Sequence, residues 1–67
     1  MQNLIPGQVW TDDEDCLMIT EVTNDDFITV KGIAVLNGVV NVNYTTRLRD
    51  GTYLEFPKLI FEPKTYA

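Results

Sequence analysis

The stretch FITVKGIAVLNGVVNVNY, from Phe27 to Tyr44, decides the fold of this chain. Both sides of Asn37-Gly38 are rich in β-branched residues, which favour pleated, half-buried strands. An Asn-Gly pair between two such runs is a strong hairpin signal, because a type I′ turn needs positive φ at both central residues. The stretch therefore predicts a β-hairpin with strands at 27–36 and 39–44.

Two details refine this hairpin. Side chains alternate along its second strand, so Val40, Val42 and Tyr44 are expected on one face and the asparagines on the other. Gly32 lies inside the first strand, where a glycine is typical of a bulge or a sharp bend.

The segments before the hairpin extend the sheet. An apolar run at 16–22 is bounded by polar residues, and the asparagine and aspartates of 23–26 favour a turn. Gln8-Val9-Trp10 is expected to form a short first strand. The sequence thus predicts two further strands on the N-terminal side.

The segments after the hairpin supply the rest. Asp50-Gly51 is a second turn signal, and 52–56 is expected to pair behind it. Pro57 cannot donate to a ladder, so the chain should turn or run along an edge there. Residues 58–61 form either a final strand or a single helical turn. No helix of normal length is expected.

Size and composition predict one all-β domain over residues 1–67. A chain of 67 residues buries only about 60% of its unfolded surface. The single cysteine, Cys16, permits no intrachain disulfide, and the lack of histidine excludes Cys/His zinc sites. Four or five short antiparallel strands joined by tight turns favour a small antiparallel barrel or roll that protects its edges.

Charge is distributed unevenly along the chain. The net charge is −5, and the first 30 residues hold seven acids and no lysine or arginine. This balance disfavours direct nucleic-acid binding and suits either a protein partner with a basic surface or plain solubility. The candidate partner-binding residues are Asp12, Asp13, Glu14, Asp15, Glu21, Asp25 and Asp26.

Strand order predicts where these acids lie, because alternate loops of a meander share an end. The acidic loop, residues 12–15, is expected beside the Asn37-Gly38 turn. The turn at 24–26 is expected near Arg47 and Arg49, which would partly compensate its aspartates. The acidic loop would then be the uncompensated end of the molecule.

Catalytic and metal chemistry are not expected. Without histidine there is no Ser/His or Cys/His pair, and Cys16 is expected to be an inert thiol. Consecutive carboxylates at 12–15 do not converge easily on a cation, so a solvated loop is expected there rather than a metal site. We therefore expect no enzyme activity, no cofactor and no metal.

The aromatic residues near the C-terminal end raise a further possibility. Tyr53 and Phe56 cannot share a strand face, because their separation is odd. One of them, with Leu59 or Phe61, is a candidate for an exposed apolar patch that contacts a partner.

Several phrases together resemble small SH3-like proteins of bacteriophages and mobile elements. These are Ile5-Pro6-Gly7-Gln8-Val9-Trp10, an acidic turn, Met18-Ile19-Thr20-Glu21-Val22, and an ending of Tyr53-Leu54-Glu55-Phe56 with Leu59-Ile60-Phe61-Glu62-Pro63. The resemblance implies a small SH3-like five-stranded antiparallel barrel or roll and no catalytic residues. The tyrosine-rich first-loop motif of signalling SH3 domains is missing, so Pro-rich peptide binding is not expected.

The expected function is a non-catalytic, phage-encoded protein–protein interaction module. Its acidic surface would bind and inhibit a host nucleic-acid-handling complex, such as a CRISPR or restriction defence, with nucleic-acid mimicry as one route. The alternative is an assembly accessory of a phage particle that acts as a homo-oligomer. No apolar run reaches the roughly 20 residues of a membrane span and no signal peptide is visible, so a cytoplasmic location without membrane contact is expected.

Overall fold

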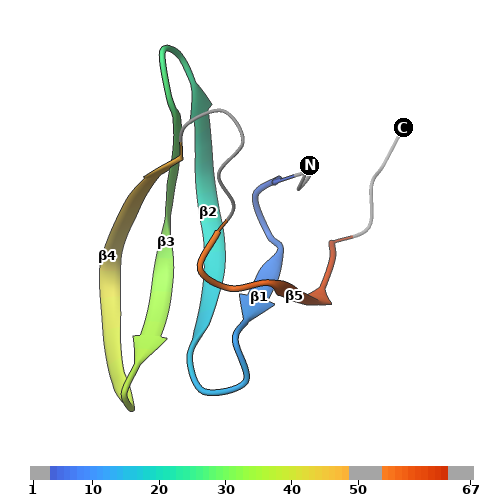
Figure 1. Ribbon diagram of the computed structural model, residues 1–67, viewed down its shortest axis with the longest axis vertical. Helices are drawn as coiled ribbons and strands as arrows, with labels where there is room; N and C mark the ends of the chain where they lie inside the picture. The colour runs from blue at the N-terminus through green and yellow to red at the C-terminus, as the bar shows by residue number, and fades with distance from the viewer. Residues whose placement is uncertain (1–3, 49–53, 64–67) are drawn as a thin grey trace.

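The computed structural model describes residues 4–48 and 54–63. Within them the chain forms one antiparallel sheet of five strands and no helix. The strands are β1 (Val9–Thr11), β2 (Cys16–Asn24), β3 (Ile28–Leu36), β4 (Val39–Leu48) and β5 (Lys58–Phe61). Their order in the sheet is β4-β3-β2-β1-β5 (Figure 1). The predicted all-β class and the five antiparallel strands are confirmed.

The β3–β4 hairpin follows the predicted turn chemistry. Asn37 and Gly38 have φ values of 52° and 77°, both in the left-handed region that a type I′ turn requires. β2 and β4 run further than predicted, to Asn24 and Leu48, because the whole length of β3 pairs with both neighbours. Residues 58–61 form a strand and not a helical turn.

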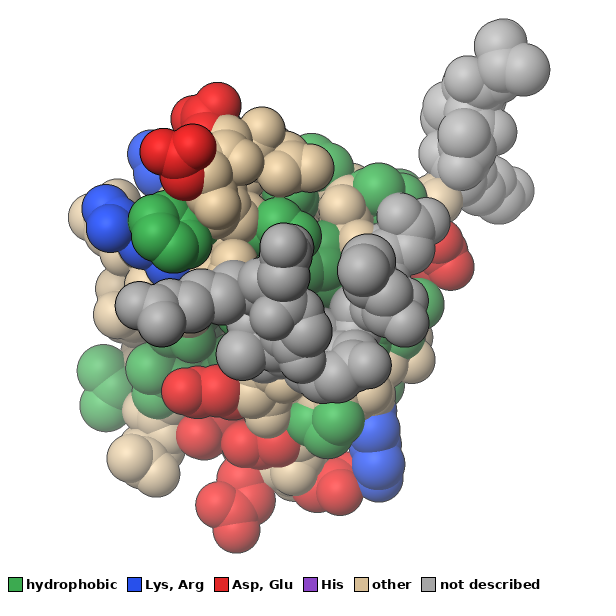
Figure 2. All heavy atoms as spheres, turned by 45° about the horizontal axis from the view of Figure 1, so that its top comes forward, with side chains coloured by type: hydrophobic (Ala, Val, Ile, Leu, Met, Phe, Trp, Pro, Cys, Tyr) green, Lys and Arg blue, Asp and Glu red, His purple; other side chains and the backbone are tan. Residues whose placement is uncertain are grey.

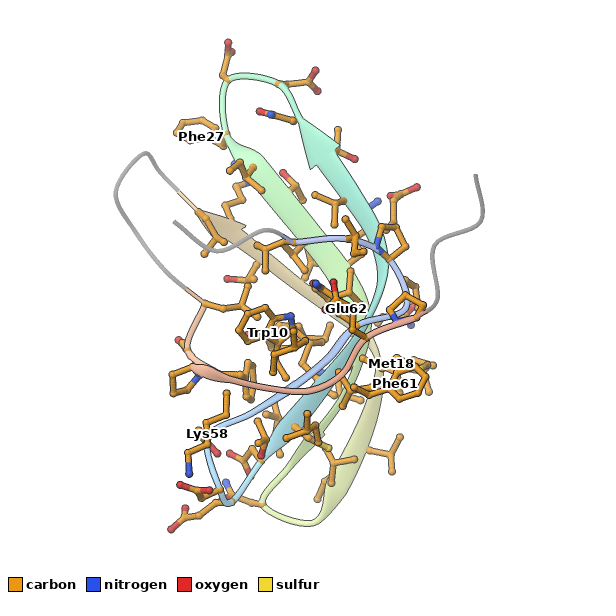
Figure 3. The ribbon with its side chains drawn as sticks, turned by 90° about the vertical axis from the view of Figure 1, so that its right-hand side faces the viewer. Trp10, Met18, Phe27, Lys58, Phe61 and Glu62 are labelled. Atoms are coloured by element: carbon orange, nitrogen blue, oxygen red, sulfur yellow. The ribbon has the colours of Figure 1, made fainter. Side chains whose placement is uncertain are left out.

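The expected strand at 52–56 is wrong for its described part. Residues 54–56 pair with no strand, and Leu54 and Phe56 instead point into the core, where they are 5% and 1% exposed. The segment crosses the inner side of the sheet on its way to β5 (Figure 3). Thr52, Tyr53 and the predicted Asp50-Gly51 turn lie outside the described residues.

The hydrogen-bonded sheet is open, with β4 and β5 as its two edges. The pairing of the described residues runs from one edge to the other and includes no β4–β5 ladder, so it does not close a barrel. The reason is local: β5 has four residues and pairs only with β1, and Leu54 and Phe56 cover the core with their side chains while their backbone joins no ladder.

The core lies on one side of the sheet, called here the inner face. Leu17 is opposite Ala34, and Ile19 is opposite Gly32, so these neighbours point to the same side. The described core consists of Trp10, Leu17, Ile19, Val30, Ala34, Leu48, Leu54 and Phe56.

Gln8 is the buried polar residue of this core, with 1% exposure. Its Oε1 accepts hydrogen bonds from the backbone N–H of Ile5 (3.0 Å) and from the indole N–H of Trp10 (3.1 Å). The Gln8 amide oxygen therefore gives the buried indole N–H of Trp10 a hydrogen-bond acceptor, and it also fixes the chain that leads into β1.

A bulge lies next to Gly32 on the β2 side. Ile19 is opposite Gly32 and Glu21 is opposite Lys31, so Thr20 is an extra residue in β2. A Cβ added to Gly32 would lie 2.1 Å from the carbonyl oxygen of Met18, so only glycine fits this close approach. The prediction of a bulge or bend at Gly32 is confirmed.

A second bulge lies on the β4 side of the same glycine. Gly32 is opposite Tyr44 whereas Ala34 is opposite Asn41, so β4 carries one residue more than β3 in this interval. The expected common face of Val40, Val42 and Tyr44 is therefore wrong, because the bulge reverses the alternation between Val40 and Tyr44. Tyr44 packs edge-on against the core residue Phe56, with ring centroids 6.1 Å apart, while Val40 is 60% exposed.

Candidate functional site

The acidic loop joins β1 to β2 and is held together by Asp12. The Asp12 carboxylate accepts hydrogen bonds from the backbone N–H of Asp15 (2.7 Å) and of Glu14 (3.0 Å). These two bonds, with that from Asp15 the stronger influence, hold the pKa of Asp12 below its ordinary value. Asp12 thus shapes the loop as well as adding charge to it.

Asp13 adopts a left-handed conformation, with φ of 82°. Its backbone N–H bonds to the Thr11 hydroxyl (3.1 Å), and its carboxylate forms an ion pair with the Lys58 ammonium at 2.8 Å. The prediction of an uncompensated acidic loop is therefore wrong at Asp13, whereas Asp12, Glu14 and Asp15 form no ion pair among the described residues. A loop and a strand 45 positions apart meet there, which sequence order does not show.

Asp15 connects the acidic loop to the β3–β4 turn. Its Oδ1 accepts a hydrogen bond from the backbone N–H of Asn37 at 2.9 Å. The prediction that the two loops share an end of the sheet is confirmed, and Figure 1 shows both below the strands. Among the loop acids, Glu14 is exposed and its side chain makes no recorded bond in the described part of the chain.

The remaining candidate acids lie elsewhere. Glu21 pairs with Lys31 across β2 and β3 at 3.4 Å, and Asp25 and Asp26 form the turn at the other end of β2. No ion pair joins this turn to Arg47 within residues 4–48 and 54–63, and Arg49 lies outside the described residues. Arg47 nevertheless lies opposite Thr29, three residues after Asp26, so the prediction that it shares this end of the sheet is confirmed, although no direct ion pair with the turn occurs among the described residues.

The seven candidate acids therefore occupy separate places. Nine residues of β2 separate the acidic loop from the 25–26 turn, which is roughly 25–30 Å at about 3.3 Å per residue. Figure 2 shows acidic side chains in distinct groups on the face in view. The arrangement gives a charged loop at one end and a charged turn at the other, rather than one continuous track.

The side of the sheet opposite the core carries a second set of apolar residues. Phe61 and Met18 both lie opposite Val9, and Met18 lies opposite Ile33 on its other side. Figure 3 shows Met18 and Phe61 side by side, pointing away from Trp10. Residues directly opposite one another share a face, so one apolar row crosses the sheet from β5 to β3.

A parallel row lies next to it. Val35 is opposite Cys16 on one side and Val40 on the other, which extends the apolar surface to β4. We call the two rows together the outer band: Val9, Cys16, Met18, Ile33, Val35, Val40 and Phe61. None of these residues is among the buried core, and Met18, Val40 and Phe61 are 40%, 60% and 58% exposed.

The outer band borders the acidic loop. Cys16, the first residue of β2, is opposite Thr11 at the base of this loop, and Asp15 precedes it directly. The other half of the same face is polar and carries the Glu21–Lys31 pair. The outer face therefore has an apolar part with a carboxylate border at one side and an ion pair at the other.

The predicted apolar patch near the C-terminal end is confirmed in part. Leu59 and Phe61 are 40% and 58% exposed, whereas Phe56 is buried, and Tyr53 lies outside the described residues. β2 and β3 also contribute to the apolar surface, which the sequence did not predict. The signal was present in Cys16-Leu17-Met18-Ile19, four apolar residues in succession, which is typical of a strand that is apolar on both faces.

A hollow of about 240 Å³ lies over the two bulges, between Thr20 and Lys31 on one side and Asn43 to Thr45 on the other. Burial, followed by the negative charge of Glu55, raises the pKa of the Tyr44 hydroxyl. The described lining holds no nucleophile next to a general base. It offers a mixed polar surface without a recognisable catalytic set.

Three further features bear on chemistry. Cys16 is a half-buried free thiol. No group of three or more Cys, Asp or Glu residues placed to hold a metal ion occurs among the described residues. Residues 4–48 and 54–63 also contain no helix with the length and apolar character to cross a bilayer.

Comparison with models of known protein families, with curated proteins and with solved structures gives no match. The features of the described residues that bear on function are therefore the outer band and the acidic loop beside it.

Proposed function

We propose that this chain is a non-catalytic protein-binding module that docks its partner on the outer band and the adjoining acidic loop. The observation that carries the proposal is a set of apolar side chains that crosses the sheet from β5 to β4 while facing solvent. Contiguous apolar surface of this kind, bordered by charge, is typical of interaction sites.

The border supports a choice of partner. Glu14 is free to contact another molecule, whereas Asp12 and Asp15 are engaged in holding the loop. With a net charge of −5, the module is attracted to a partner whose surface has lysines or arginines around an apolar centre. The apolar contact supplies affinity and the carboxylates favour basic partners.

The finer proposal concerns what the partner does. A basic surface is what nucleic-acid-handling proteins present to phosphates, so a phage-encoded module of this type would inhibit a host defence complex, such as a CRISPR or restriction system, by covering that surface. The separation of the acids favours docking as a protein over imitation of a continuous phosphate track. We also propose that the fold is an SH3-like roll that stays open between β4 and β5, which the strand order and the burial of Leu54 and Phe56 over the inner face support.

The alternative function, an assembly accessory that acts as an oligomer, is favoured by a different observation. The edge strand β4 has no partner on its outer side among the described residues.

The apolar contact is tested with a matched pair of variants. Met18 and Phe27 are both exposed, at 40% and 41%, but Met18 lies in the outer band and Phe27 lies beside the turn at the other end of β2 (Figure 3). We expect Met18→Glu to weaken capture of the partner from host lysate at least tenfold, about 1.4 kcal/mol, and Phe27→Glu to leave capture unchanged. Equal capture by both variants would contradict the proposed interface.

The charged contact needs variants that leave the loop folded. Reversal of Asp12 or Asp15 would also remove loop bonds, so Glu14→Lys is the appropriate change, with Asp26→Lys at the opposite end as its control. We expect Glu14→Lys alone to weaken capture, and salt of about 0.5 M to weaken capture by the parent protein, because screening shortens the range of exposed charges. A partner that binds Glu14→Lys as tightly as the parent rules out the acidic border.

A further inference from the structure

The two edges of the sheet are protected very differently. β5 has four residues and stands between Pro57 and Pro63, and prolines and short length are both devices that discourage pairing at an edge. β4 has ten residues, contains no proline, and pairs only with β3 among the described residues. Its outer side is therefore the edge that is open to another strand.

The composition of β4 indicates which strand fits. Residues 39–46 carry no charge, and Val39, Val40 and Val42 are 66%, 60% and 64% exposed. In a chain of net charge −5, two copies repel one another over the acidic loop and the 25–26 turn, but not along this segment. A second copy of the chain meets no like charge there.

We propose that two copies of this chain pair antiparallel through the free edges of β4, about a twofold axis near Val42 and Asn43. Two identical antiparallel strands can pair about a twofold axis, because each contact of residue i with residue j of the other copy is repeated by residue j with residue i. With this axis, residues 44–46 of one copy lie opposite residues 41–39 of the other. The result is one continuous sheet of ten strands.

The charges at the ends of the pair are complementary. In this register Arg47 comes opposite Gly38 of the second copy. Gly38 follows Asn37, whose backbone N–H is bonded to Asp15 of the acidic loop. Each arginine therefore reaches the acidic end of the other copy, twice per dimer, and this contact favours the proposed register over a shifted one.

The bulge in β4 lies on the proposed axis. The backbone N–H of Asn43 already bonds to the Asn41 side chain at 3.1 Å, so the ladder forms through the segments on either side rather than at the centre. A ladder this short buries less than the roughly 800 Å² per partner of a standard interface. The pairing is thus reversible and depends on protein concentration.

The test is sedimentation velocity of the purified chain over a concentration series, with a matched pair of variants. Val42 and Ile60 are 64% and 61% exposed, one on each edge strand. Val42→Lys places two like charges at the axis and is expected to raise the dimer dissociation constant at least tenfold, whereas Ile60→Lys leaves it unchanged. Thermal melting of both variants establishes that each is folded.

Arg47→Glu is the second variant, and it keeps the test decisive if Val42→Lys fails to fold. It brings negative charge to the acidic end of the other copy, so dimerisation is expected to weaken, and to weaken most at low salt. A parent chain that stays monomeric to millimolar concentration, or a dimer lost in Ile60→Lys and kept in Val42→Lys, overturns the proposal. Met18→Glu separates it from the proposed function, since that variant loses the protein partner but keeps the dimer.

Discussion

Replacing Gly32 by alanine tests the geometry of the bend in the sheet. The added Cβ would lie 2.1 Å from the carbonyl oxygen of Met18 and 2.9 Å from Cδ1 of Leu17. The Leu17 side chain can rotate, but the Met18 oxygen belongs to the backbone of β2, which pairs with strands on both sides. Relief of the clash therefore requires part of the ladder to move.

The cost follows from this contact. Overpacking a core with one methyl group typically costs about 1–3 kcal/mol, and a clash with backbone belongs at the upper end. We expect Gly32→Ala to lose about 3 kcal/mol of the free energy of unfolding. A domain of this length has a total free energy of unfolding of about 3–10 kcal/mol, so the variant retains little net stability. In thermal terms the loss is a fall in Tm of roughly 12–24 °C.

The assay is thermal and urea denaturation followed by circular dichroism, with Gly38→Ala as control. A Cβ at Gly38 meets no atom within 4 Å, but the residue has φ of +77°, so this variant measures the left-handed conformation alone, at about 1–2 kcal/mol. The expected order of stability is parent, Gly38→Ala, then Gly32→Ala. A Gly32→Ala protein as stable as the Gly38→Ala control would refute the close approach of β2 and β3.

Two further predictions concern the core and the acidic loop. Phe56→Ala removes a side chain that is 1% exposed and should cost about 3–5 kcal/mol, visible as loss of cooperative melting; a Tm within a few degrees of the parent would show that residues 54–56 do not close the core. Because the folded pKa of Asp12 lies below its ordinary value of 3.8, its carboxylate stabilises the fold above that pH, and this contribution is lost as the pH falls through the lower, folded pKa. Asp12→Asn should therefore be less stable than the parent near pH 7 and should lose less between pH 7 and about pH 3 in urea titrations; identical pH profiles would contradict this.

Local rules explain why much of the fold could be predicted. The Asn37-Gly38 turn depends on two adjacent residues, and the bend at Gly32 depends on one, so the sequence shows both directly. The ends of β2 and β4 depend on pairing across the sheet, for example of Ile28 with Leu48, and a single strand does not reveal that. Residues 54–56 have the composition of a strand, but burial of Leu54 and Phe56 in the core determines their conformation.

The candidate site was harder to predict for a similar reason. Charge can be counted along a sequence, but the contacts of Asp13 with Lys58 and of Asp15 with Asn37 join distant segments. Alternation likewise shows that a strand has two faces without showing which one the chain covers. The crossing of residues 54–57 over the inner face settles that question and leaves Met18 on the outer one.

The pairing of β1 with β5 joins the first strand to the last, and this has a consequence for synthesis. Val9 is opposite Phe61, and the indole of Trp10 shares a core with Phe56. Long-range contacts of this kind slow folding, since a long loop must close before they form. A nascent chain can build the central hairpin while it is still on the ribosome, but its core stays open until the final strand has emerged. Products that terminate before β5 therefore lack a closed core and should be substrates for cellular proteolysis.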